Sequence, residues 1–449
     1  MIDARPLSDF ASFDSERLMN TAKVAFGNRD CWVIRVPARL CLAADHTDYW
    51  EVFSPQLVTF SSDSCTMRAV ISPRTDSLVR LFNVGEFEDC EFDMRVDSPP
   101  LASDRSQWLD WLNEQGTPAA HWSNYVRGPV HHAQMHHGAR NGFDMIIDSN
   151  IPPSSGASSS SALAICASVA IRFANGITTE QRVLTMETAD AEWFVGTRGG
   201  MMDHATMVFA EAGKMLRLTF RPFTTYTLDS PPQLADYRFV TIFTHPSDKG
   251  TSTQLEFNAR ALAARDVIPQ MLVDSTKNLP DILNVSCLPD ELMQKYPTLQ
   301  TATGVKLQIT DWLAFARGEL ERSQEIQILL QADGDIATLG GYMDQAWRDA
   351  GELYGIRTPQ MDLIANVCRS CNGVLGLKVM GAGFGGNLLA LVRADDLDNL
   401  RKTLQANSEL FTRPVNESVL EHKPGQGVSI LTGPEDNMNW APLWTNEEG

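Results

Sequence analysis

The stretch SSGASSSSALAICASVAI, residues 154–171, joins a run of small residues to a continuous apolar segment. Glycine and serine let a backbone approach a ligand closely, and serine is favoured at the start of a helix. The residues after Ser160 are apolar on nearly all sides of the expected helix, which predicts that the helix is buried. Its first turn would present unpaired N–H groups and the positive end of the helix dipole, which suits an anion. By itself, the pattern equally fits a flexible serine-rich loop before an ordinary helix.

A second glycine-rich stretch, GAGFGG, spans Gly381–Gly386. It matches the dinucleotide-binding fingerprint GxGxxG, which requires a strand before it and a helix after it. Here VLGLKVM precedes the glycines and NLLALV follows them, and both segments read as strands. The stretch is therefore interpreted as a hairpin turn that supports a phosphate-binding loop or packs between strands. A Rossmann dehydrogenase is disfavoured, and the lack of GxxxxGK[ST] in the sequence excludes the usual P-loop.

Two further segments carry side chains suited to chemistry. In the segment PARLCLAADHTDYWE, the side chains of Arg39, Asp45, His46 and Asp48 lie close together between strand-like runs. They either bind the hydroxyl groups of a polyol or form a charged surface turn. Asp203 lies in the apolar, glycine-rich stretch GTRGGMMDHATMVFAEAG. A carboxylate there must be paired, hydrogen-bonded or catalytic, because burying it alone is costly.

Strand-like and helix-like segments follow one another without a regular βαβ rhythm, which predicts an α+β fold in two halves. Strands are expected at 32–36, 57–60, 67–71, 143–147, 215–220 and 239–244, and on both sides of the 381–386 turn. Helices are expected from 160 onward, over most of 254–333, and as a pair over 336–371. The boundary is placed in the proline-containing stretch 222–236. The polar tail from Thr432 either docks through Trp440 and Trp444 or is disordered.

The composition is that of an acidic globular protein. The 449 residues carry a formal net charge of −19, which argues against nucleic acid and anionic membranes as partners. No apolar run approaches the ~18 residues that span a bilayer, and the first segment lacks the apolar core of a signal peptide, so a cytoplasmic location is expected. The scattered cysteines indicate reduced thiols. The histidines at 131, 132, 136 and 137 are interpreted as a solvated helix face.

Taken in order, these segments resemble the signatures of the GHMP kinases, and of the galactokinases in particular. PARLCLAADHTDY is similar to the galactokinase signature APGRVNLIGEHTDY, and SSGASSSSA is similar to the GLSSSA phosphate loop. GTRGGMMDH is similar to GxxCGIMDQ, and KVMGAGFGGNLLALV is similar to the motif GAGFGGC. The resemblance runs from about residue 30 to 395 and implies a two-domain GHMP kinase fold. An N-terminal ribosomal-protein-S5-like domain would span 1–225 and a C-terminal ferredoxin-like domain 226–449, with the active site between them.

The resemblance also implies ATP-dependent phosphorylation, with Mg2+, of the anomeric hydroxyl of galactose or a related sugar. The implied catalytic residues are Asp203, as the base, and Arg39. The implied sugar-binding residues are Arg39, Asp45, His46, Asp48, Gly200, Asp203 and Phe257. The implied ATP-binding residues are Trp122, Ser154, Ser155, Gly156, Ala157, Ser158, Ser159 and Ser160. Bracing of the site is implied for Gly381, Gly383, Gly385 and Gly386, and metal binding for Ser160 and Glu192. The resemblance leaves open whether the kinase is a monomer or a homodimer.

Several positions depart from the galactokinase pattern. Asp45 replaces the glutamate of GEHTDY, Ala44 replaces the preceding glycine, and Phe257 replaces a tyrosine. The metal-binding glutamate of the family falls on Ala191, one residue before Glu192. Changes at hydroxyl-reading positions place the identity of the sugar in question more than the kinase chemistry. A catalytically silent sugar and ATP sensor, and a GHMP kinase for a different sugar or a non-sugar alcohol, are the alternatives.

Overall fold

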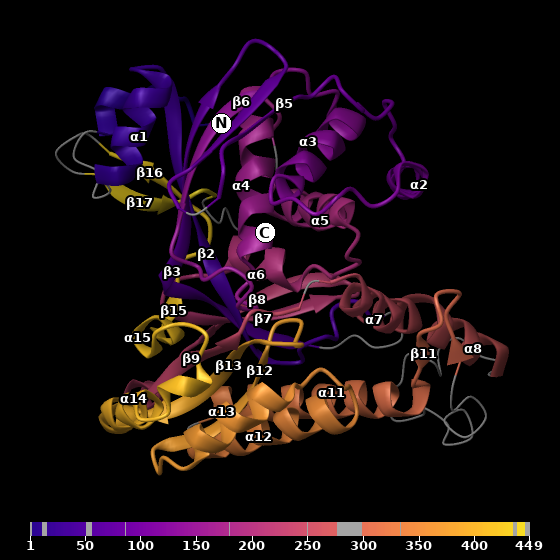
Figure 1. Cartoon of the computed structure of the whole chain (residues 1–449), viewed down its shortest axis with the longest axis vertical. Coiled ribbons are helices and arrows are strands. Elements are labelled where there is room, and N and C mark those ends of the chain that lie inside the picture. The colour runs from indigo at the N-terminus through magenta and orange to yellow at the C-terminus, as the bar shows by residue number, and fades with distance from the viewer. Residues whose placement is uncertain are drawn as a thin grey trace.

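The computed structural model describes residues 2–10, 16–50, 56–85, 87–178, 180–248, 250–275, 299–332, 334–433 and 438–444. Its two main sheets lie one toward each end of the long axis, and helices cover both (Figure 1). The helices and strands are thus mixed in each half, as the sequence predicts.

The larger sheet has the strand order β17-β16-β2-β3-β6-β4-β5. These strands are β2 (Asp30–Ala43), β3 (Leu57–Pro73), β4 (Leu78–Asn83), β5 (Cys90–Asp93), β6 (Phe143–Ser149), β16 (Ser429–Thr432) and β17 (Asn439–Pro442). Four further strands pair along its margins: β1 (Arg5–Pro6), β7 (Lys214–Phe220), β8 (Phe223–Asp229) and β15 (Pro424–Gly425).

Helices cover both faces of this sheet because successive side chains of a strand point to opposite faces. On β2, Ile34 and Val36 join the core that contains α4 (Ser159–Ala174), whereas Cys31 and Val33 join the core that contains α1 (Glu16–Phe26). The α4 face also carries α2 (Arg105–Gln115), α3 (Asn124–His137), α5 (Gln181–Glu192) and α6 (Met202–Phe209) (Figure 1). α4 is buried along nearly its whole length, as its apolar sequence predicts.

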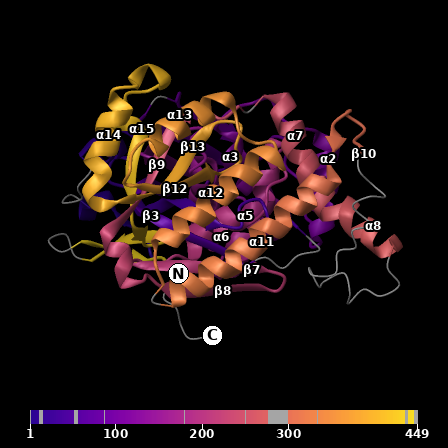
Figure 2. The same ribbon diagram turned by 90° about the horizontal axis from the view of Figure 1, so that it is seen from below.

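The second sheet has the order β12-β13-β9-β14, formed by β12 (Val374–Met380), β13 (Gly386–Arg393), β9 (Tyr237–His245) and β14 (Val419–His422). β12 and β13 pair as an antiparallel hairpin across the glycine-rich turn, and no helix follows that turn. Figure 2 shows α11 (Ile309–Gln331), α12 (Ala337–Glu352) and α13 (Pro359–Arg369) over this sheet. α14 (Leu397–Gln405) and α15 (Val415–Ser418) complete this half.

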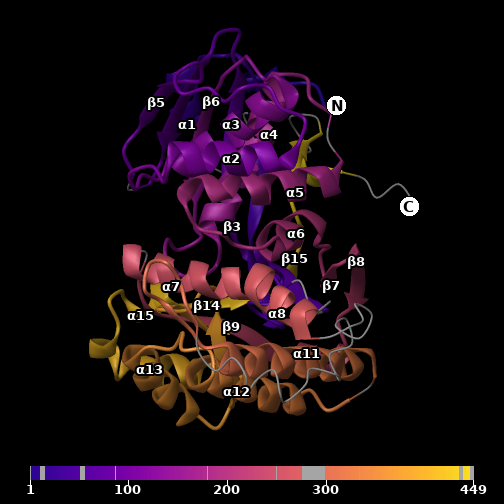
Figure 3. The same cartoon turned by 90° about the vertical axis from the view of Figure 1, so that its right-hand side faces the viewer.

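Between the two halves, α7 (Thr251–Leu262) continues through a π-helical turn (Ala263–Val267) into α8 (Ile268–Ser275) (Figure 3). Part of the helical stretch expected over 254–333 lies outside the described residues. Within the described part of that stretch, β10 (Leu299–Gln300) and β11 (Lys306–Leu307) form a short hairpin instead. The division of the chain at 225/226 stays a prediction.

The C-terminal segment returns to the first sheet. β15 pairs with β3, β16 pairs with β2, and β17 pairs with β16. The indole of Trp440 lies under the Arg35 guanidinium, 4.7 Å from ring centroid to Cζ. Of the two alternatives for the tail, docking therefore holds for residues 438–444, and the strands after 424 belong to the sheet of the N-terminal half.

The interpretation of the histidine run as a solvated helix face is wrong for His131 and His132, which are buried. α2 lies against this face of α3: Trp108 packs on His132, and Trp111 packs on His131. A sequence shows which side of a helix is polar but not which distant helix covers that side. Among the described residues, no helix is both long enough and apolar enough to cross a membrane.

Candidate active site between the two halves

The predicted phosphate loop packs on the region around the β12–β13 turn. The Ser155 carbonyl accepts a hydrogen bond from the Asn387 N–H at 2.8 Å, and the Ser154 carbonyl accepts one from the Ser247 N–H at 3.0 Å. These are backbone contacts between segments of the two halves. They fix the position of the loop whatever the side chains of its serines do.

Glycines make this close approach possible. Gly156 has a φ of 79°, and a Cβ on it would lie 2.5 Å from the Met380 carbonyl oxygen. A Cβ on Gly381 would lie 2.6 Å from the Gly156 oxygen, and those on the other turn glycines would also meet atoms closer than 3.0 Å. The latter group is Gly383, Gly385 and Gly386. The turn thus holds the loop by contacts that a larger residue would prevent.

The loop ends at the buried helix α4. Ser158 precedes the helix with a φ of 60°, and Ser159 and Ser160 lie partly exposed in its first turn. Ala157 is buried, so the loop is anchored on its inner side. The N–H groups of a first helical turn have no partner within the helix, and together with the helix dipole they favour an anion. The geometry is that of an anion site at the interface of the two halves.

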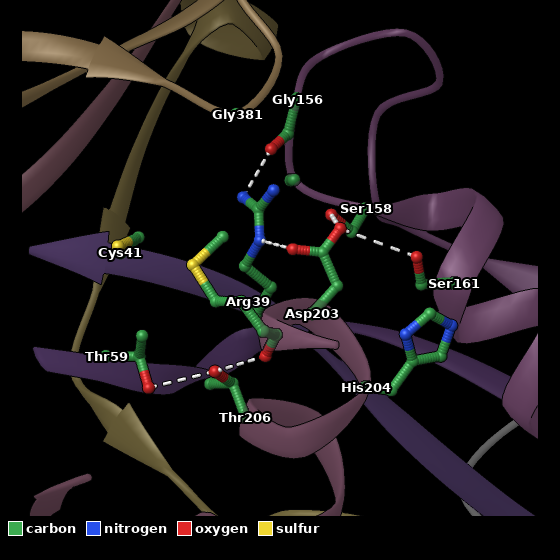
Figure 4. Close-up of polar contacts among 12 residues, drawn as sticks. Arg39, Cys41, Thr59, Gly156, Ser158, Ser161, Asp203, His204, Thr206 and Gly381 are labelled. Carbon is green, nitrogen blue, oxygen red and sulfur yellow. Dashed lines mark hydrogen bonds and ion pairs between the residues drawn. The ribbon is translucent and has the colours of Figure 1, made fainter. Parts of the chain in front are cut away.

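Asp203 lies in the first turn of α6, with its side chain 25% exposed, and faces this loop (Figure 4). Its Oδ1 accepts a hydrogen bond from Nε of Arg39 at 2.5 Å, and its Oδ2 accepts one from the Ser158 hydroxyl. Arg39 is buried on β2 and donates from Nη1 to the Gly156 carbonyl at 2.6 Å. Arg39 therefore joins the carboxylate to the phosphate loop.

Two carboxyl groups at the start of α6 have pKa values shifted in opposite directions. Burial would raise the pKa of Asp203, but the charge and hydrogen bond of Arg39 hold it below its ordinary value. Burial raises the pKa of Asp48, although the Met202 N–H donates a hydrogen bond to it. Environments that separate two carboxyl pKa values assign different roles to the two groups. Asp203 is the one held ionised.

Asp48 positions the start of α6. Its Oδ2 accepts a hydrogen bond from the Met202 N–H at 3.0 Å, directly before Asp203. Gly200 makes room for this carboxylate, because a Cβ there would lie 1.9 Å from Asp48 Oδ2. We expected Gly200 to allow a close approach of the backbone to a sugar. In the structure, the group that approaches it closely is the Asp48 carboxylate.

Asp45 and His46, expected to hold sugar hydroxyls, have protein partners in the structure, and their sugar-binding role stays a prediction. The Asp45 carboxylate forms a buried ion pair with Lys378 of β12. His46 Nε2 lies 3.0 Å from the Gly381 carbonyl, and its Nδ1 lies 3.3 Å from the Tyr49 hydroxyl. Burial lowers the pKa of His46 to about 4, so the ring is neutral at pH 7. Local sequence patterns could not reveal these partners, because Lys378 and Gly381 lie more than three hundred residues further along the chain.

Residues of the C-terminal half also contact two segments of the N-terminal half, one at Ala44 and one at residues 198–199. The buried Glu319 carboxylate accepts the Ala44 N–H at 2.9 Å. Asn258 of α7 accepts the Arg198 N–H at 2.9 Å, and Arg265 donates to the Gly199 carbonyl at 2.6 Å. Sequence reasoning missed Arg265 and Lys378, whose partners are distant in the chain.

The remaining predicted residues lie around this centre. Phe257 is half-buried, with its ring centroid 6.3 Å from that of His46 and 6.0 Å from that of Tyr49. Trp122, expected near the adenine, is half-buried, and its indole N–H has no hydrogen-bond partner among the described residues. Trp122 packs on the core that contains Ala157, and its adenine-binding role stays a prediction.

Glu192, at the end of α5, reaches the first turn of α4. Its Oε2 accepts a hydrogen bond from the Ser161 hydroxyl at 2.8 Å, and that hydroxyl lies 3.5 Å from Asp203 Oδ2. Metal binding was predicted for Ser160 and Glu192; the serine hydroxyl that contacts Glu192 is that of Ser161, and the role of Ser160 stays a prediction. Residues three apart share a helix face, and Ser161 therefore lies on the side of Ser158, toward Asp203. Carboxylate and hydroxyl oxygens are suitable ligands for Mg2+.

Comparison with known proteins identifies the class to which this fold and site belong. Residues 124–211 match the family model of the GHMP kinase N-terminal domain, and residues 326–410 match that of the GHMP kinase C-terminal domain. The chain thus matches both GHMP kinase domain models, and the predicted two-domain α+β GHMP kinase fold is confirmed.

Within the GHMP kinases, the chain resembles galactokinases over most of its length. It is 26% identical over 380 residues to the galactokinase of Chloroflexus aurantiacus, covering 83% of this chain and 87% of the relative. It is 24% identical over 428 residues to a Roseiflexus galactokinase, covering 92% and 97%. The crystal structure of Lactococcus lactis galactokinase with galactose superposes with a TM-score of 0.72 at 20% identity, covering 91% of this chain and 97% of that one. The mevalonate kinase of Methanococcus jannaschii gives 0.54 at 15% identity, covering 87% and 96%. The resemblance to galactokinases predicted from the motifs is confirmed.

Proposed function

We propose that this chain transfers the γ-phosphoryl group of ATP to the anomeric hydroxyl of galactose or a related sugar, giving a sugar 1-phosphate. The contact of Arg39 and Ser158 with Asp203, beside a helix N-terminus, carries the proposal. The GHMP kinase domains and the galactokinase relatives support the class of reaction. A cytoplasmic location is part of the proposal, supported by free thiols throughout the described part of the chain.

Asp203 is the base in this mechanism. Its lowered pKa keeps it ionised, and one of its oxygens accepts the proton of the sugar hydroxyl as that hydroxyl attacks phosphorus. The partly exposed side chain leaves an approach for the hydroxyl. Arg39 orients the carboxylate and places a positive charge beside the transferring phosphoryl group. Transfer of a phosphoryl group depends mainly on such positioning and charge stabilisation.

The groups expected to bind the phosphates of ATP would offset, locally, the negative charge of the whole chain. A net charge of −19 disfavours an incoming nucleotide on average, so attraction must come from groups at the site. The first turn of α4 supplies backbone N–H groups and the positive end of the dipole for the β- and γ-phosphates. Glu192 and the hydroxyls of Ser160 or Ser161 are the groups that would hold Mg2+. Bound Mg2+ would neutralise charge on the phosphate oxygens.

The residues expected to bind the sugar leave galactose and related sugars as candidate substrates. Asp45 is shorter than the family's glutamate and is paired with Lys378, so it cannot be assumed to read a hydroxyl. Phe257 brings an apolar ring to a position where the family has a tyrosine. The oligomeric state, monomer or homodimer, does not enter the proposed mechanism.

The proposal is tested by measuring ADP release with ATP, Mg2+ and a panel of galactose, N-acetylgalactosamine, galacturonate, arabinose and other hexoses. We expect at least one sugar to raise turnover well above the ATPase background and to yield a 1-phosphate. Binding of a sugar without turnover would instead identify a catalytically silent sensor. Turnover only with a non-sugar alcohol would identify a different GHMP kinase.

A pair of variants tests the role of the base. Asp203→Asn should reduce turnover by orders of magnitude with little change in the thermal unfolding midpoint. Asp148→Asn is the matched control, because Asp148 also pairs with an arginine, Arg68, and its side chain is 23% exposed. Equal turnover in the Asp203→Asn variant and the control would refute the role of Asp203.

A further inference from the structure

His204 is a buried histidine directly after the proposed base, and the mechanism above gives it no role. Its side chain is 3% exposed, and neither ring nitrogen has a hydrogen-bond partner among the described residues. A buried polar group without a partner costs free energy, so such groups in native proteins call for a partner that completes them. Figure 4 shows His204 beside Ser161, on the same side of Asp203.

One ring nitrogen of His204 lies beside an oxygen at the proposed metal position. His204 Nε2 is within ion-pair distance of Glu192 Oε2, at 2.9 Å, but makes no hydrogen bond to it. The same Glu192 oxygen lies 2.8 Å from the Ser161 hydroxyl. Ligand atoms bound at about 2.1 Å to one metal ion and at right angles to each other lie about 3.0 Å apart. Glu192 Oε2 is therefore spaced from each of the other two atoms like neighbouring ligands of a single ion.

We propose that His204 supplies an imidazole nitrogen to the divalent cation of the nucleotide, together with Glu192 and the Ser161 hydroxyl. This inference rests on the proposed ATP-dependent function and assigns the metal preference of that site. No group of three or more His, Cys, Asp or Glu side chains forms a metal cage in the described part of the chain. The remaining ligands would accordingly be phosphate oxygens and water, as is usual where a cation binds with a nucleotide.

A nitrogen ligand changes which cation is preferred. Oxygen ligands suit Mg2+, whereas imidazole suits transition ions, and Mn2+ accepts both imidazole and carboxylate. Mn2+ should therefore bind more tightly than Mg2+ by a larger factor than at an all-oxygen site. Replacing His204 by glutamine, which offers an amide oxygen, should move the preference back toward Mg2+.

The direct test is pulsed electron paramagnetic resonance of Mn2+ bound with ADP to the full chain, prepared with 15N-labelled histidine. We expect a 15N coupling to Mn2+ in the unmodified protein, which needs no variant to interpret. His204→Gln should abolish the coupling, while His137→Gln, at an exposed histidine of α3, should keep it. Bound Mn2+ without 15N coupling, or no bound Mn2+ at all, would overturn the proposal.

Binding constants give a second readout. The free Mn2+ signal is titrated with protein in the presence of ADP, and His204→Gln should raise the Mn2+ dissociation constant at least about tenfold. The Mg2+ dissociation constant, measured by competition with Mn2+, should rise by a smaller factor. Equal losses for both ions would mean that His204 only supports the fold, which overturns the proposal. A histidine coupling in a protein that phosphorylates no sugar would leave this inference standing while the proposed function fails.

Discussion

Gly200→Ala tests whether Asp48 positions the catalytic carboxylate. The added Cβ would lie 1.9 Å from Asp48 Oδ2 and 2.2 Å from its Cγ, whereas ordinary contacts begin near 3.4 Å. The carboxylate must therefore move by roughly 1.5 Å, and it is buried with little room to do so. That displacement breaks its hydrogen bond to the Met202 N–H, worth about 0.5–1.5 kcal/mol.

The consequence for activity follows from the position of Asp203, one residue after Met202. A shift of about 1 Å in a reacting group can reduce the rate about a hundredfold. We therefore expect kcat/KM for the preferred sugar to fall by about two orders of magnitude in Gly200→Ala, mainly through kcat. Steady-state ADP release measures this, and a thermal unfolding scan measures the accompanying loss of stability.

The neighbouring glycine provides the control. A Cβ on Gly199 would meet no heavy atom within 4 Å, so Gly199→Ala adds the same methyl group to the same loop without displacing Asp48. Its kcat/KM should stay within about threefold of the unmodified protein. Wild-type kinetics in Gly200→Ala, or an equal loss in Gly199→Ala, would refute the positioning role of Asp48.

Two further predictions concern stability. Lys378→Met leaves Asp45 buried without its cation and should lower the free energy of unfolding, measured in urea, by about 3–5 kcal/mol. Adding Asp45→Asn to this variant should recover part of that loss. Additive effects of the two substitutions would contradict the pairing. Burial holds the pKa of His422 at about 4, below the usual 6.5, so the unfolded chain binds more protons between these values. The stability due to neutral His422 is complete above pH 6.5 and is lost as pH falls toward 4, by about 2 kcal/mol at pH 5. His422→Gln should reduce the pH 7-to-5 difference in unfolding free energy by that amount, and an unchanged difference would contradict the assignment.

Local patterns predicted the parts of the fold that depend on local chemistry. The buried helix α4 and the β12–β13 hairpin follow from apolar periodicity and from the glycines of the turn. β3 was predicted as two strands, because the polar Ser61 and Ser62 interrupt its apolar runs. The strand continues because both serines are buried with partners: Ser61 donates to the Thr206 carbonyl, and Ser62 bonds to His422. Polar residues with distant partners look like a turn when only the sequence is read.

The same reason limits the prediction of the site. Motif order located Arg39, Asp203 and the phosphate loop, whose family-like residues contact one another directly. It could not show that Lys378 neutralises Asp45, since neither residue type has a fixed partner spacing. It also could not show that the Ser161 hydroxyl, one residue beyond Ser160, is the one bonded to Glu192, and metal binding by Ser160 stays a prediction.

The loop of residues 44–49 is held mainly from the other half of the chain. Glu319 binds the Ala44 backbone, Lys378 pairs with Asp45, the Gly381 carbonyl contacts His46, and Tyr354 bonds to Tyr49. Asp48, by contrast, binds the start of α6 in its own half. A relative movement of the halves would therefore pull on the sugar-facing loop and, through Asp48, on the base. The effect of Ala44 and Asp45, which differ from the galactokinase pattern, therefore depends on their partners in the C-terminal half. The shorter carboxylate of Asp45 changes a contact between the halves, because it pairs with Lys378, and under the proposed function we expect sugar specificity to depend on that contact as well as on the contacts with the sugar.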